Sequence, residues 1–339
     1  MQVVAFGDRS YLSQVSVLRR AAIDALADYP LEVARLRLLL HAYNTTFRVD
    51  TTDGRRFALR LNTGSRKTPE GLRAEMSWLA ALARDTDLSI PEPMRTTDGR
   101  LFTEVHPSAF GRPLPVALFG WLPGPDLEDG ARPEHLVVAG RTMAALHAHA
   151  EQWTLPADAV LPPLDTILLD VPDHLHDPHP HLTPEREVLV HAAFDHISRV
   201  LVDLPAEQPR HVLHADLHLG NMKWHRGRLS VFDFDDCGIG MPLQDLAISS
   251  YYLRPQRALE SAMAEGYASV RPLPTCTTEQ YEAIVAARSL VLLNDLLVTE
   301  NAELRAVLPR YAANTEIKLR HYLDAGEFRH DLPDVQPLW

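Results

Sequence analysis

Apolar and polar positions follow two different periods in the first third of the chain. Residues Val15–Leu26 (VSVLRRAAIDAL) place apolar side chains at helical spacing, which predicts an amphipathic helix. Two β-rich runs follow, TTFRVDT and RRFALRLNT, and Asp53-Gly54 separates them as in a tight hairpin turn. The runs PEPMRTT and RLFTEVH repeat this arrangement around Asp98-Gly99. The pattern predicts a small α+β unit in which hairpins build an antiparallel sheet.

The helical period returns between these two hairpins. Thr68 is a suitable N-cap, Pro69 suits the first helical position, and the pattern continues through Met76, Leu79 and Leu82. We therefore predict a helix that begins directly after Thr68.

The run PVALFGWLPGP ends in a Pro-Gly-Pro break, and beyond it the helical period dominates. Helices are predicted over these segments: His135–Ala150, 185–202, Leu246–Tyr252, Tyr281–Glu300 and Ala302–Tyr322. A proline- and histidine-rich connection, which includes DVPDHLHDPHPHL, separates the first two. We therefore expect three parts: a strand-rich N-terminal lobe over residues 1–117, an apolar hinge over 118–123 and a helix-rich C-terminal lobe over 124–339.

Composition and charge narrow the class of protein. A chain of 339 residues is long for one compact domain and comfortable for two lobes. The net charge of −12 argues against nucleic acid as a general partner, because phosphate backbones need a basic surface. Only two cysteines occur, which excludes a disulfide framework. No apolar run is long enough to span a bilayer and the N-terminus lacks a secretory signal, so we expect a cytoplasmic protein without a membrane partner. The sequence gives no indication of the oligomeric state.

The stretch HVLHADLHLGN, residues 211 to 221, is followed by two apolar runs around Arg226-Gly227 that predict a third hairpin. Pairing of these runs would bring Asn221 and Asp233 together at the open end. An amide oxygen beside a carboxylate suits Mg²⁺, which proteins bind with few side chains plus substrate phosphates. Asp216 would lie at the same place, where it could accept a proton from a hydroxyl. This division of roles fits phosphoryl transfer.

The spacing His214-x-Asp216-x-x-x-x-Asn221, followed by Asp233-Phe234-Asp235, resembles the catalytic and metal loops of the kinase-like phosphotransferases. That superfamily includes aminoglycoside phosphotransferases, choline kinases, type II homoserine kinases and bacterial stress-response kinases. The segments WLPG, GRTMAALHAH and QDLA stand in the order that the family expects, and the resemblance runs from about residue 36 to 253. It implies a two-lobed, protein-kinase-like α+β fold, with a nucleotide-binding antiparallel-sheet lobe and a larger helical lobe for catalysis and acceptor binding.

The resemblance also implies roles in the central segment. Asp216 would be the catalytic base that orients the acceptor hydroxyl. Asn221 and Asp233 would hold Mg²⁺ at the ATP phosphates. His214 would order the catalytic loop and Asp245 would brace it from the following helix, although Asp245 is also a candidate N-cap for that helix.

In the N-terminal lobe, Arg60 stands where protein kinases carry the strand lysine that pairs with ATP phosphates, and its fork suits bidentate contact. Glu75 is its expected partner, with Glu70 as the reserve. Asn44 would lie at the turn of a phosphate-covering hairpin, which departs from the protein-kinase pattern because LLHAYNTTFRV contains no glycine. The hinge residues expected to hold adenine by backbone hydrogen bonds are Phe119, Gly120 and Trp121.

The implied activity is transfer of the γ-phosphoryl group of ATP to a hydroxyl of a small molecule such as an amino alcohol, an amino acid or an aminoglycoside. Asp235 and Asp236 are candidates for a second metal contact or for recognition of acceptor charge, and the acidic surroundings favour a cationic amine. A Ser/Thr protein kinase of the stress-response type is the alternative. An inactive ATP-binding regulatory protein is a further one.

A different class follows if the histidines bind metal. His214, Asp216 and His218 alternate, so on a strand they would share one face and could ligate zinc, as in a metallohydrolase. The histidines that could be recruited to the same site are His174, His176, His179 and His181. The loop-forming Leu-Gly-Asn that follows and the oxygen ligand Asp233 favour magnesium instead.

Overall fold

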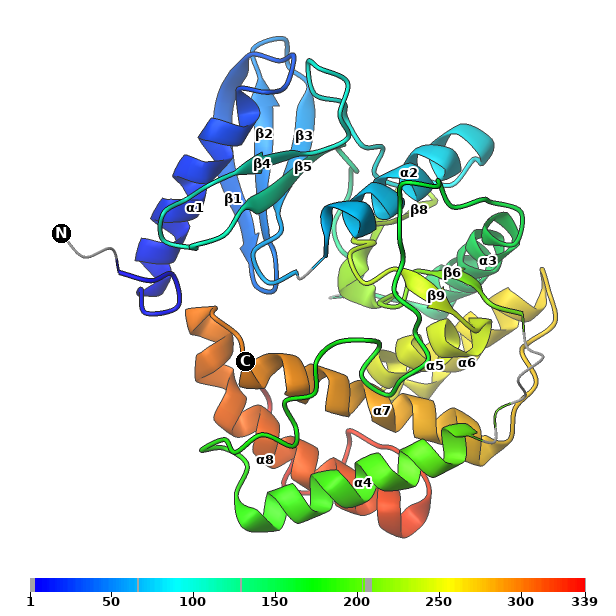
Figure 1. Ribbon diagram of the computed structural model, residues 1–339. Coiled ribbons are helices and arrows are strands. Elements are labelled where there is room, and N and C mark those ends of the chain that lie inside the picture. The colour runs from blue at the N-terminus through cyan, green and yellow to red at the C-terminus, as the bar shows by residue number, and fades with distance from the viewer. Residues whose placement is uncertain (1–3, 66, 129, 203, 205–208, 339) are drawn as a thin grey trace. The chain divides into compact units, whose positions relative to one another are not determined.

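The computed structural model describes residues 4–65, 67–128, 130–202, 204 and 209–338, and the chain divides into two compact units (Figure 1). The first unit comprises Met1–Leu122, Leu155–Val160 and Thr299–Ala306. The second comprises Pro123–Thr154, Leu161–Val298 and Val307–Trp339.

The first unit is built on a five-stranded antiparallel sheet in the order β1-β2-β3-β5-β4. Its strands are β1 (Val33–His41), β2 (Thr45–Thr51), β3 (Arg56–Leu61), β4 (Thr103–Val105) and β5 (Leu114–Gly120). Alternate residues of β2 are buried, and Phe47 and Val49 are completely enclosed, as the period of two predicts. Helix α1 (Tyr11–Leu26) packs against the sheet and buries Leu18 and Ala22 in the same core (Figure 1).

The predicted hairpin around Asp53-Gly54 is confirmed, because β2 pairs with β3 and Gly54 has a φ of 86°, which glycine tolerates. Helix α2 (Pro69–Asp85) begins as predicted. The hydroxyl of Thr68 accepts a hydrogen bond from the Gly71 N–H at 3.2 Å, and Pro69 occupies the first turn.

The second predicted hairpin differs from the expectation. Only its later arm forms a strand, β4, and β4 pairs with β5. The segment PEPMRTT has Pro91 and Pro93, which have no N–H to donate to a ladder, and it contributes a single bridge between Pro93 and Phe119.

The second unit is mainly helical. Its helices are α3 (Pro133–Ala150), α4 (Pro184–Val202), α5 (Pro242–Leu253), α6 (Arg257–Ala268), α7 (Thr278–Leu297) and, from Val307 onward, α8 (Ala302–Ala325). Two short antiparallel pairs complete it: β6 (His211–Leu213) with β9 (Gly238–Gly240), and β7 (Met222–His225) with β8 (Arg228–Val231). Helix α6 was not delimited by the sequence pattern, whereas the other five lie where helices were predicted.

Helices α3 and α6 approach each other closely at two glycines. A Cβ atom at Gly140 would collide with the carbonyl oxygen of Met263, and a Cβ atom at Gly266 would collide with that of Val137. The backbones can touch here only because both positions lack a side chain.

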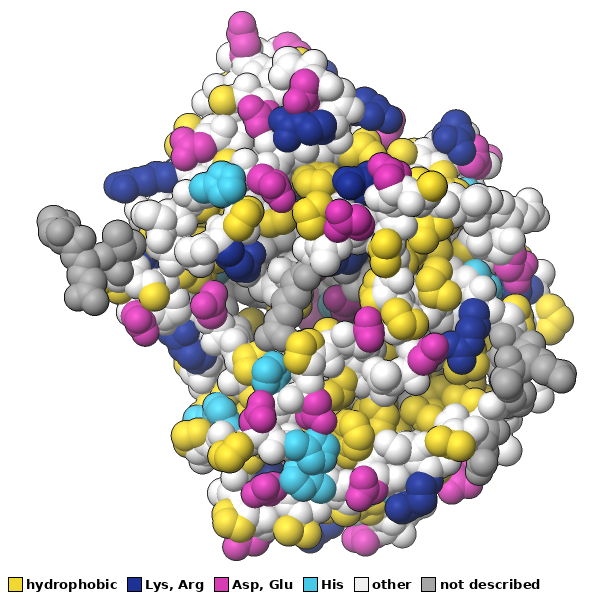
Figure 2. All heavy atoms as spheres, viewed as in Figure 1, with side chains coloured by type: hydrophobic (Ala, Val, Ile, Leu, Met, Phe, Trp, Pro, Cys, Tyr) yellow, Lys and Arg dark blue, Asp and Glu magenta, His cyan; other side chains and the backbone are white. Residues whose placement is uncertain are grey.

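The charged surface and the character of the helices agree with what the composition predicts. Figure 2 shows Lys and Arg side chains scattered singly among Asp and Glu over the face drawn, in keeping with the net charge of −12. Across the described residues, no helix combines the length and the apolar character that crossing a bilayer requires.

Candidate active site

The apolar residues of the segment from His211 to Asn221 are buried, and its polar side chains form hydrogen bonds. Val212 pairs with Ile239 across the β6–β9 ladder, and Leu217 is 1% exposed. The chain leaves β6 at Ala215, which has a φ of 62°. It then forms a short 3₁₀ turn over Leu219–Asn221, where His218 Nδ1 accepts the N–H of Gly220 at 3.1 Å. The local fold is therefore strand, loop and turn.

Both oxygens of the Asp216 carboxylate have partners. Oδ1 lies 2.5 Å from Arg288 Nη2 and accepts a hydrogen bond from the Tyr252 hydroxyl at 3.2 Å. Oδ2 accepts one from Asn221 Nδ2 at 3.1 Å and lies 3.5 Å from His218 Nε2. Burial alone would raise the pKa of Asp216, but the Arg288 guanidinium and then His218 outweigh it and hold the pKa well below its usual range. Asp216 is therefore a carboxylate anion at neutral pH.

Asn221 lies beside Phe232 at the open end of the β7–β8 hairpin, and Asp233 follows Phe232 directly. Met222 pairs with Val231, and the Phe232 N–H donates to the Asn221 carbonyl at 3.0 Å. Asp233 has a φ of 63°, a region that few residues other than glycine adopt. The Asn221 amide nitrogen donates to the backbone oxygen and to Oδ2 of Asp216, so its amide oxygen is the atom left to coordinate a cation. One amide oxygen and one carboxylate fit a hard cation such as Mg²⁺.

Asp245 holds the start of the loop that follows β6 by binding its backbone N–H groups. Its carboxylate accepts the N–H groups of His214 at 3.1 Å and Ala215 at 2.6 Å, and it also contacts His147 Nε2 at 2.9 Å. The N-cap interpretation of Asp245 is wrong. Met241 occupies the N-cap of α5, and Asp245 lies within the first turn with its carboxylate engaged by the loop.

The histidines of the loop do not share a strand face. Strand β6 ends at Leu213, before His214. The Nδ1 atom of His214 accepts the Asp216 N–H at 3.3 Å and its Nε2 faces the Phe232 carbonyl at 3.1 Å, so both ring nitrogens are engaged. Within the part of the chain that the structure describes, no cluster of three or more His, Cys, Asp or Glu side chains is arranged to hold a metal.

The histidines of the connection pair locally instead. His174 lies 3.0 Å from Asp177, and His176 lies 2.6 Å from Asp173. The rings of His179 and His181 have centroids 5.5 Å apart.

One further carboxylate, that of Asp236, lies close to Arg288, and Asp235 precedes it in the chain. Asp236 Oδ2 is 3.6 Å from Arg288 Nη2, and Asp235 is 7% exposed. Burial raises the pKa of Asp236, and the negative charges of Asp216, Asp235 and Asp295 raise it further against the opposing charge of Arg288. Asp295 of α7 was absent from the sequence-based site, as were Arg288 and Tyr252.

In the first unit, Arg60 and Glu75 form a bidentate ion pair. Arg60 Nη1 lies 2.8 Å from Glu75 Oε1, and Nη2 lies 2.9 Å from Oε2. Lys67 Nζ reaches the same carboxylate at 2.9 Å. Glu70, the reserve partner, is 49% exposed and faces Arg73 at 4.0 Å. Burial would raise the pKa of Glu75, but the charges of Arg60 and Lys67 outweigh it and lower the pKa to about 2.

The remaining predicted nucleotide contacts lie on the sheet. Asn44 stands in the turn between β1 and β2, with its Oδ1 atom 3.4 Å from the Ser65 N–H. Phe119 lies on β5, and its ring centroid is 5.3 Å from the Arg60 guanidinium.

Gly120, a predicted adenine contact, has its N–H engaged within the first unit. It is the last residue of β5, and its N–H donates to the Glu92 carbonyl at 2.9 Å. That N–H is therefore engaged within the sheet region and is not offered to a base. Trp121 follows β5, with the Arg48 guanidinium 5.6 Å from its ring centroid.

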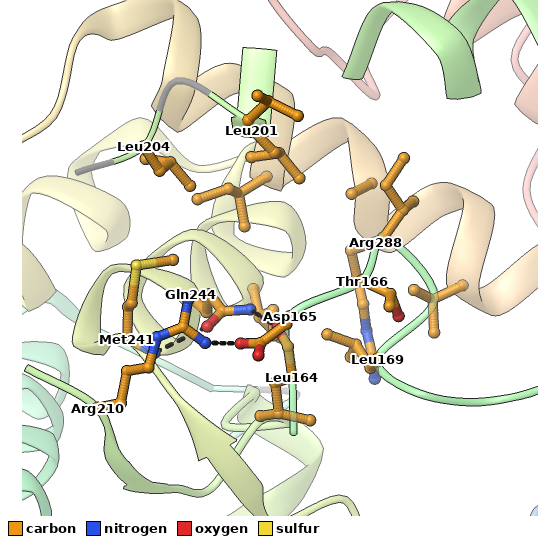
Figure 3. Close-up of a pocket in the computed structure, with 16 residues that line it drawn as sticks. Leu164, Asp165, Thr166, Leu169, Leu201, Leu204, Arg210, Met241, Gln244 and Arg288 are labelled. Atoms are coloured by element: carbon orange, nitrogen blue, oxygen red, sulfur yellow. Dashed lines mark hydrogen bonds and ion pairs between the residues drawn. The ribbon is translucent and has the colours of Figure 1, made fainter. Parts of the chain in front are cut away.

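A cavity of about 250 Å³ lies within the helical unit (Figure 3). Its wall is largely aliphatic, with contributions from Leu169, Ile248 and Val291, and Arg210 forms an ion pair with Asp165 at its edge. Figure 3 shows the Arg288 side chain extending from its helix along this wall. The cavity therefore borders the stem of the arginine whose guanidinium contacts Asp216.

Comparison with known proteins gives the class. Residues 17–276 match the family model of the phosphotransferase enzyme family, which covers most of the chain. The protein belongs to the phosphotransferase enzyme family.

Particular relatives agree with this assignment. Amicoumacin kinase of Bacillus subtilis (strain 168) is 26% identical over 230 residues, which are 67% of this chain and 66% of that protein. The match thus spans just under two thirds of that relative's length. The solved structure of a microcompartment-associated aminopropanol kinase is 26% identical with a TM-score of 0.75, covering 93% of this chain and 99% of the other.

A third comparison concerns a structure with ligands. An amicoumacin kinase in complex with AMP-PNP, Ca²⁺ and Ami is 20% identical with a TM-score of 0.68, covering 90% of this chain and 93% of the other. Together these similarities confirm the predicted family. They also confirm the predicted fold class, a protein-kinase-like α+β fold with a small antiparallel sheet and a larger helical part.

Proposed function

We propose that this protein is an ATP- and Mg²⁺-dependent phosphotransferase that moves the γ-phosphoryl group to a hydroxyl of a small cationic amine. The observation that carries the proposal is the hydrogen bond from Asn221 to the Asp216 carboxylate. Asp233 follows the second strand at the same open end of the β7–β8 hairpin. A base and two oxygen donors for a metal are then adjacent, as phosphoryl transfer needs.

In this proposal Asp216 orients the acceptor hydroxyl and takes its proton as the new O–P bond forms and the bond to the leaving ADP breaks. Asn221 and Asp233 hold Mg²⁺, which supplies charge neutralisation at the phosphates. His214 and Asp245 keep the loop in the shape that places Asp216 and Asn221 side by side.

The first unit supplies the nucleotide contacts. Arg60, fixed by Glu75, presents a fork-shaped cation that matches phosphate geometry. Lys67 adds a second positive charge at the same carboxylate. Because the Gly120 N–H is engaged, the backbone of Trp121 and Leu122 contacts the adenine.

The acceptor class follows from charge. Asp236 and Asp295 lie in one electrostatic cluster with Asp216, and a bound ammonium would relieve their mutual repulsion. Relatives described as an aminopropanol kinase and an amicoumacin kinase support a small-molecule acceptor, and aminopropanol carries both a hydroxyl and an amine. An amino alcohol is therefore the proposed acceptor.

The test is an ATP-consumption screen over amino alcohols, homoserine, aminoglycosides, macrolides and Ser/Thr peptides, with products identified by mass. Turnover is expected with amino alcohols in Mg²⁺ and none after chelation. Transfer to peptides alone would favour the protein-kinase alternative. Tight ATP binding without transfer to any acceptor would favour the inactive regulatory protein.

The mechanism has its own variant. Asp216→Asn is expected to lower kcat by about 1000-fold or more, because the hydroxyl then lacks its anionic acceptor. Asp126→Asn is the matched control, since that exposed aspartate of the same unit pairs only with Lys223 among the contacts described here. Turnover close to normal in a folded Asp216→Asn protein would contradict the role of Asp216 as the base.

A further inference from the structure

Arg288 is a buried cation in the middle of α7 that touches the catalytic loop. Its side chain is 4% exposed, and its Nη2 atom lies 2.5 Å from Asp216 Oδ1 and 3.6 Å from Asp236 Oδ2. A buried guanidinium is costly unless it is closely paired, so its place beside Asp216 is strongly determined.

Tyr252 closes a triangle with these two groups. Arg288 Nε donates to the Tyr252 hydroxyl at 3.1 Å, and that hydroxyl lies 3.2 Å from Asp216 Oδ1. An arginine can only donate and a carboxylate can only accept, so the Tyr252 proton must point to Asp216. Each of the three groups is thus fixed by the other two.

The triangle makes the two oxygens of Asp216 unequal. Oδ1 receives two donors, from Arg288 and Tyr252. Oδ2 receives one at hydrogen-bond distance, from Asn221, while His218 stands at 3.5 Å. Oδ2 therefore has the longer contacts, and it is the oxygen at which an acceptor hydroxyl can take the place of the His218 contact.

We propose that Arg288 is a positioning residue for phosphoryl transfer, which with Tyr252 fixes the Asp216 carboxylate so that Oδ2 receives the acceptor hydroxyl. This inference rests on the proposed function, because it needs Asp216 to meet an acceptor hydroxyl. Arg288 acts through Asp216 and does not itself touch the reacting atoms. Its loss leaves the base present but free to rotate away from the productive orientation.

The cavity beside Arg288 provides a test that a purely structural role would not pass. The stem of Arg288 lines the 250 Å³ cavity, so Arg288→Ala extends that cavity toward Asp216. Added guanidinium at millimolar concentration can then occupy the vacated place. Urea has nearly the same shape and no charge, and it serves as the matched additive.

The expected result separates turnover from nucleotide binding. Arg288→Ala is expected to lower kcat by about 100-fold, as a small misplacement of a reacting group does, with the KM for ATP unchanged. Guanidinium is expected to restore about 10-fold of the loss through its planar, charged donor groups, and urea to restore none. Arg288→Lys is expected to remain about 10-fold below the wild type, because a single ammonium cannot bond Asp216 and Tyr252 in the same fork.

Arg254→Gln is the matched control for burial. Arg254 is 2% exposed and pairs with Glu282 at 2.8 Å and Glu260 at 3.1 Å, and neither partner belongs to the proposed machinery. It should lose stability and keep its kcat. If Arg288→Ala does not fold, Tyr252→Phe and Arg288→Lys take its place. Each is then expected to lower kcat and to leave the KM for ATP unchanged.

Three outcomes would overturn the inference while the proposed function stands: a folded Arg288→Ala protein with normal kcat, equal effects of guanidinium and urea, or an equal loss of kcat in Arg254→Gln. If the wild-type protein transfers phosphate to none of the acceptors tested, the proposed function itself is overturned, and the inference with it. The two failures are distinguished by the wild-type assay alone.

Discussion

Each unit buries an arginine against acidic side chains, but the balance of charge is opposite in the two. In the first unit, Arg60 and Lys67 share the single carboxylate of Glu75. In the second, Arg288 faces Asp216 together with another carboxylate. Among these contacts, cations outnumber carboxylates in the first cluster, and carboxylates outnumber cations in the second.

Each cluster suits a different proposed ligand. The two cations beside Glu75 suit the phosphates of a nucleotide, whereas the two carboxylates beside Arg288 suit a metal ion or an ammonium group. The carboxyl groups respond accordingly, since the pKa of Glu75 is lowered to about 2 and the pKa of Asp236 is raised. The side chains of each cluster are thus consistent with the charge of the ligand proposed for it.

Within this comparison, the largest effect is expected from replacing Arg60 in the first cluster. Arg60→Gln should lower kcat/KM for ATP by about 100- to 1000-fold, because a fork-shaped cation is lost at the proposed phosphate site. Steady-state kinetics at varied ATP measures it. Arg56→Gln on the same strand is the control, since Arg56 is 54% exposed and should change nothing. Equal kinetics in both variants would remove Arg60 from the nucleotide site.

Glu75→Gln should act on stability. It leaves Arg60 and Lys67 close together without their shared anion, and breaking a buried pair in this way costs about 3 kcal/mol of unfolding free energy. Urea unfolding of the full chain measures the difference. Glu70→Gln on the same helix is the control, because Glu70 is 49% exposed. A loss in Glu70→Gln as large as in Glu75→Gln would contradict the pairing.

The same carboxylate predicts a dependence on pH. Because the folded-state pKa of Glu75 lies near 2, below its usual 4.5, the stability it contributes is fully present above pH 4.5 and is lost as the pH falls toward 2. This linkage amounts to about 3 kcal/mol at most. The wild-type advantage over Glu75→Gln in urea unfolding should therefore shrink steadily from pH 5 to pH 3. An advantage independent of pH would show that the charge of Glu75 is unimportant.

The smallest effect is expected for Asp236, the second carboxylate beside Arg288, and it concerns the free energy of unfolding. The raised pKa of Asp236 means that its ionised form costs stability near neutral pH, and that this cost disappears on acidification. Asp236→Asn should stabilise the protein by less than about 1 kcal/mol, since the side chain is 36% exposed and solvent screens it. A thermal unfolding scan detects this. Destabilisation would mean that the contact with Arg288 outweighs the repulsion.

Local signals explain what could be predicted from the sequence. The Asp53-Gly54 turn, the Thr68 cap and the hairpin around Arg226-Gly227 each depend on residues close together in the chain. Such features need only backbone geometry and short-range pairing.

Contacts between distant segments explain what could not. Arg288 and Tyr252 meet Asp216 from two helices that follow it by many residues, and no local pattern announces them. The engaged N–H of Gly120 depends on where the segment around Glu92 lies. A strand was predicted there because the segment precedes the Asp98-Gly99 turn signal, but its prolines cannot donate to a ladder.

The close contact of α3 with α6 has a consequence for how the sequence can change. His147 lies two turns beyond Gly140 on α3 and joins Asp245 to Tyr267, the neighbour of Gly266 on α6. Since Asp245 holds the N–H groups of the catalytic loop, a methyl group at either glycine would separate the helices and withdraw this support. Gly140 and Gly266 have no side chain and lie outside the proposed active site, yet they are expected to be among the positions least tolerant of substitution.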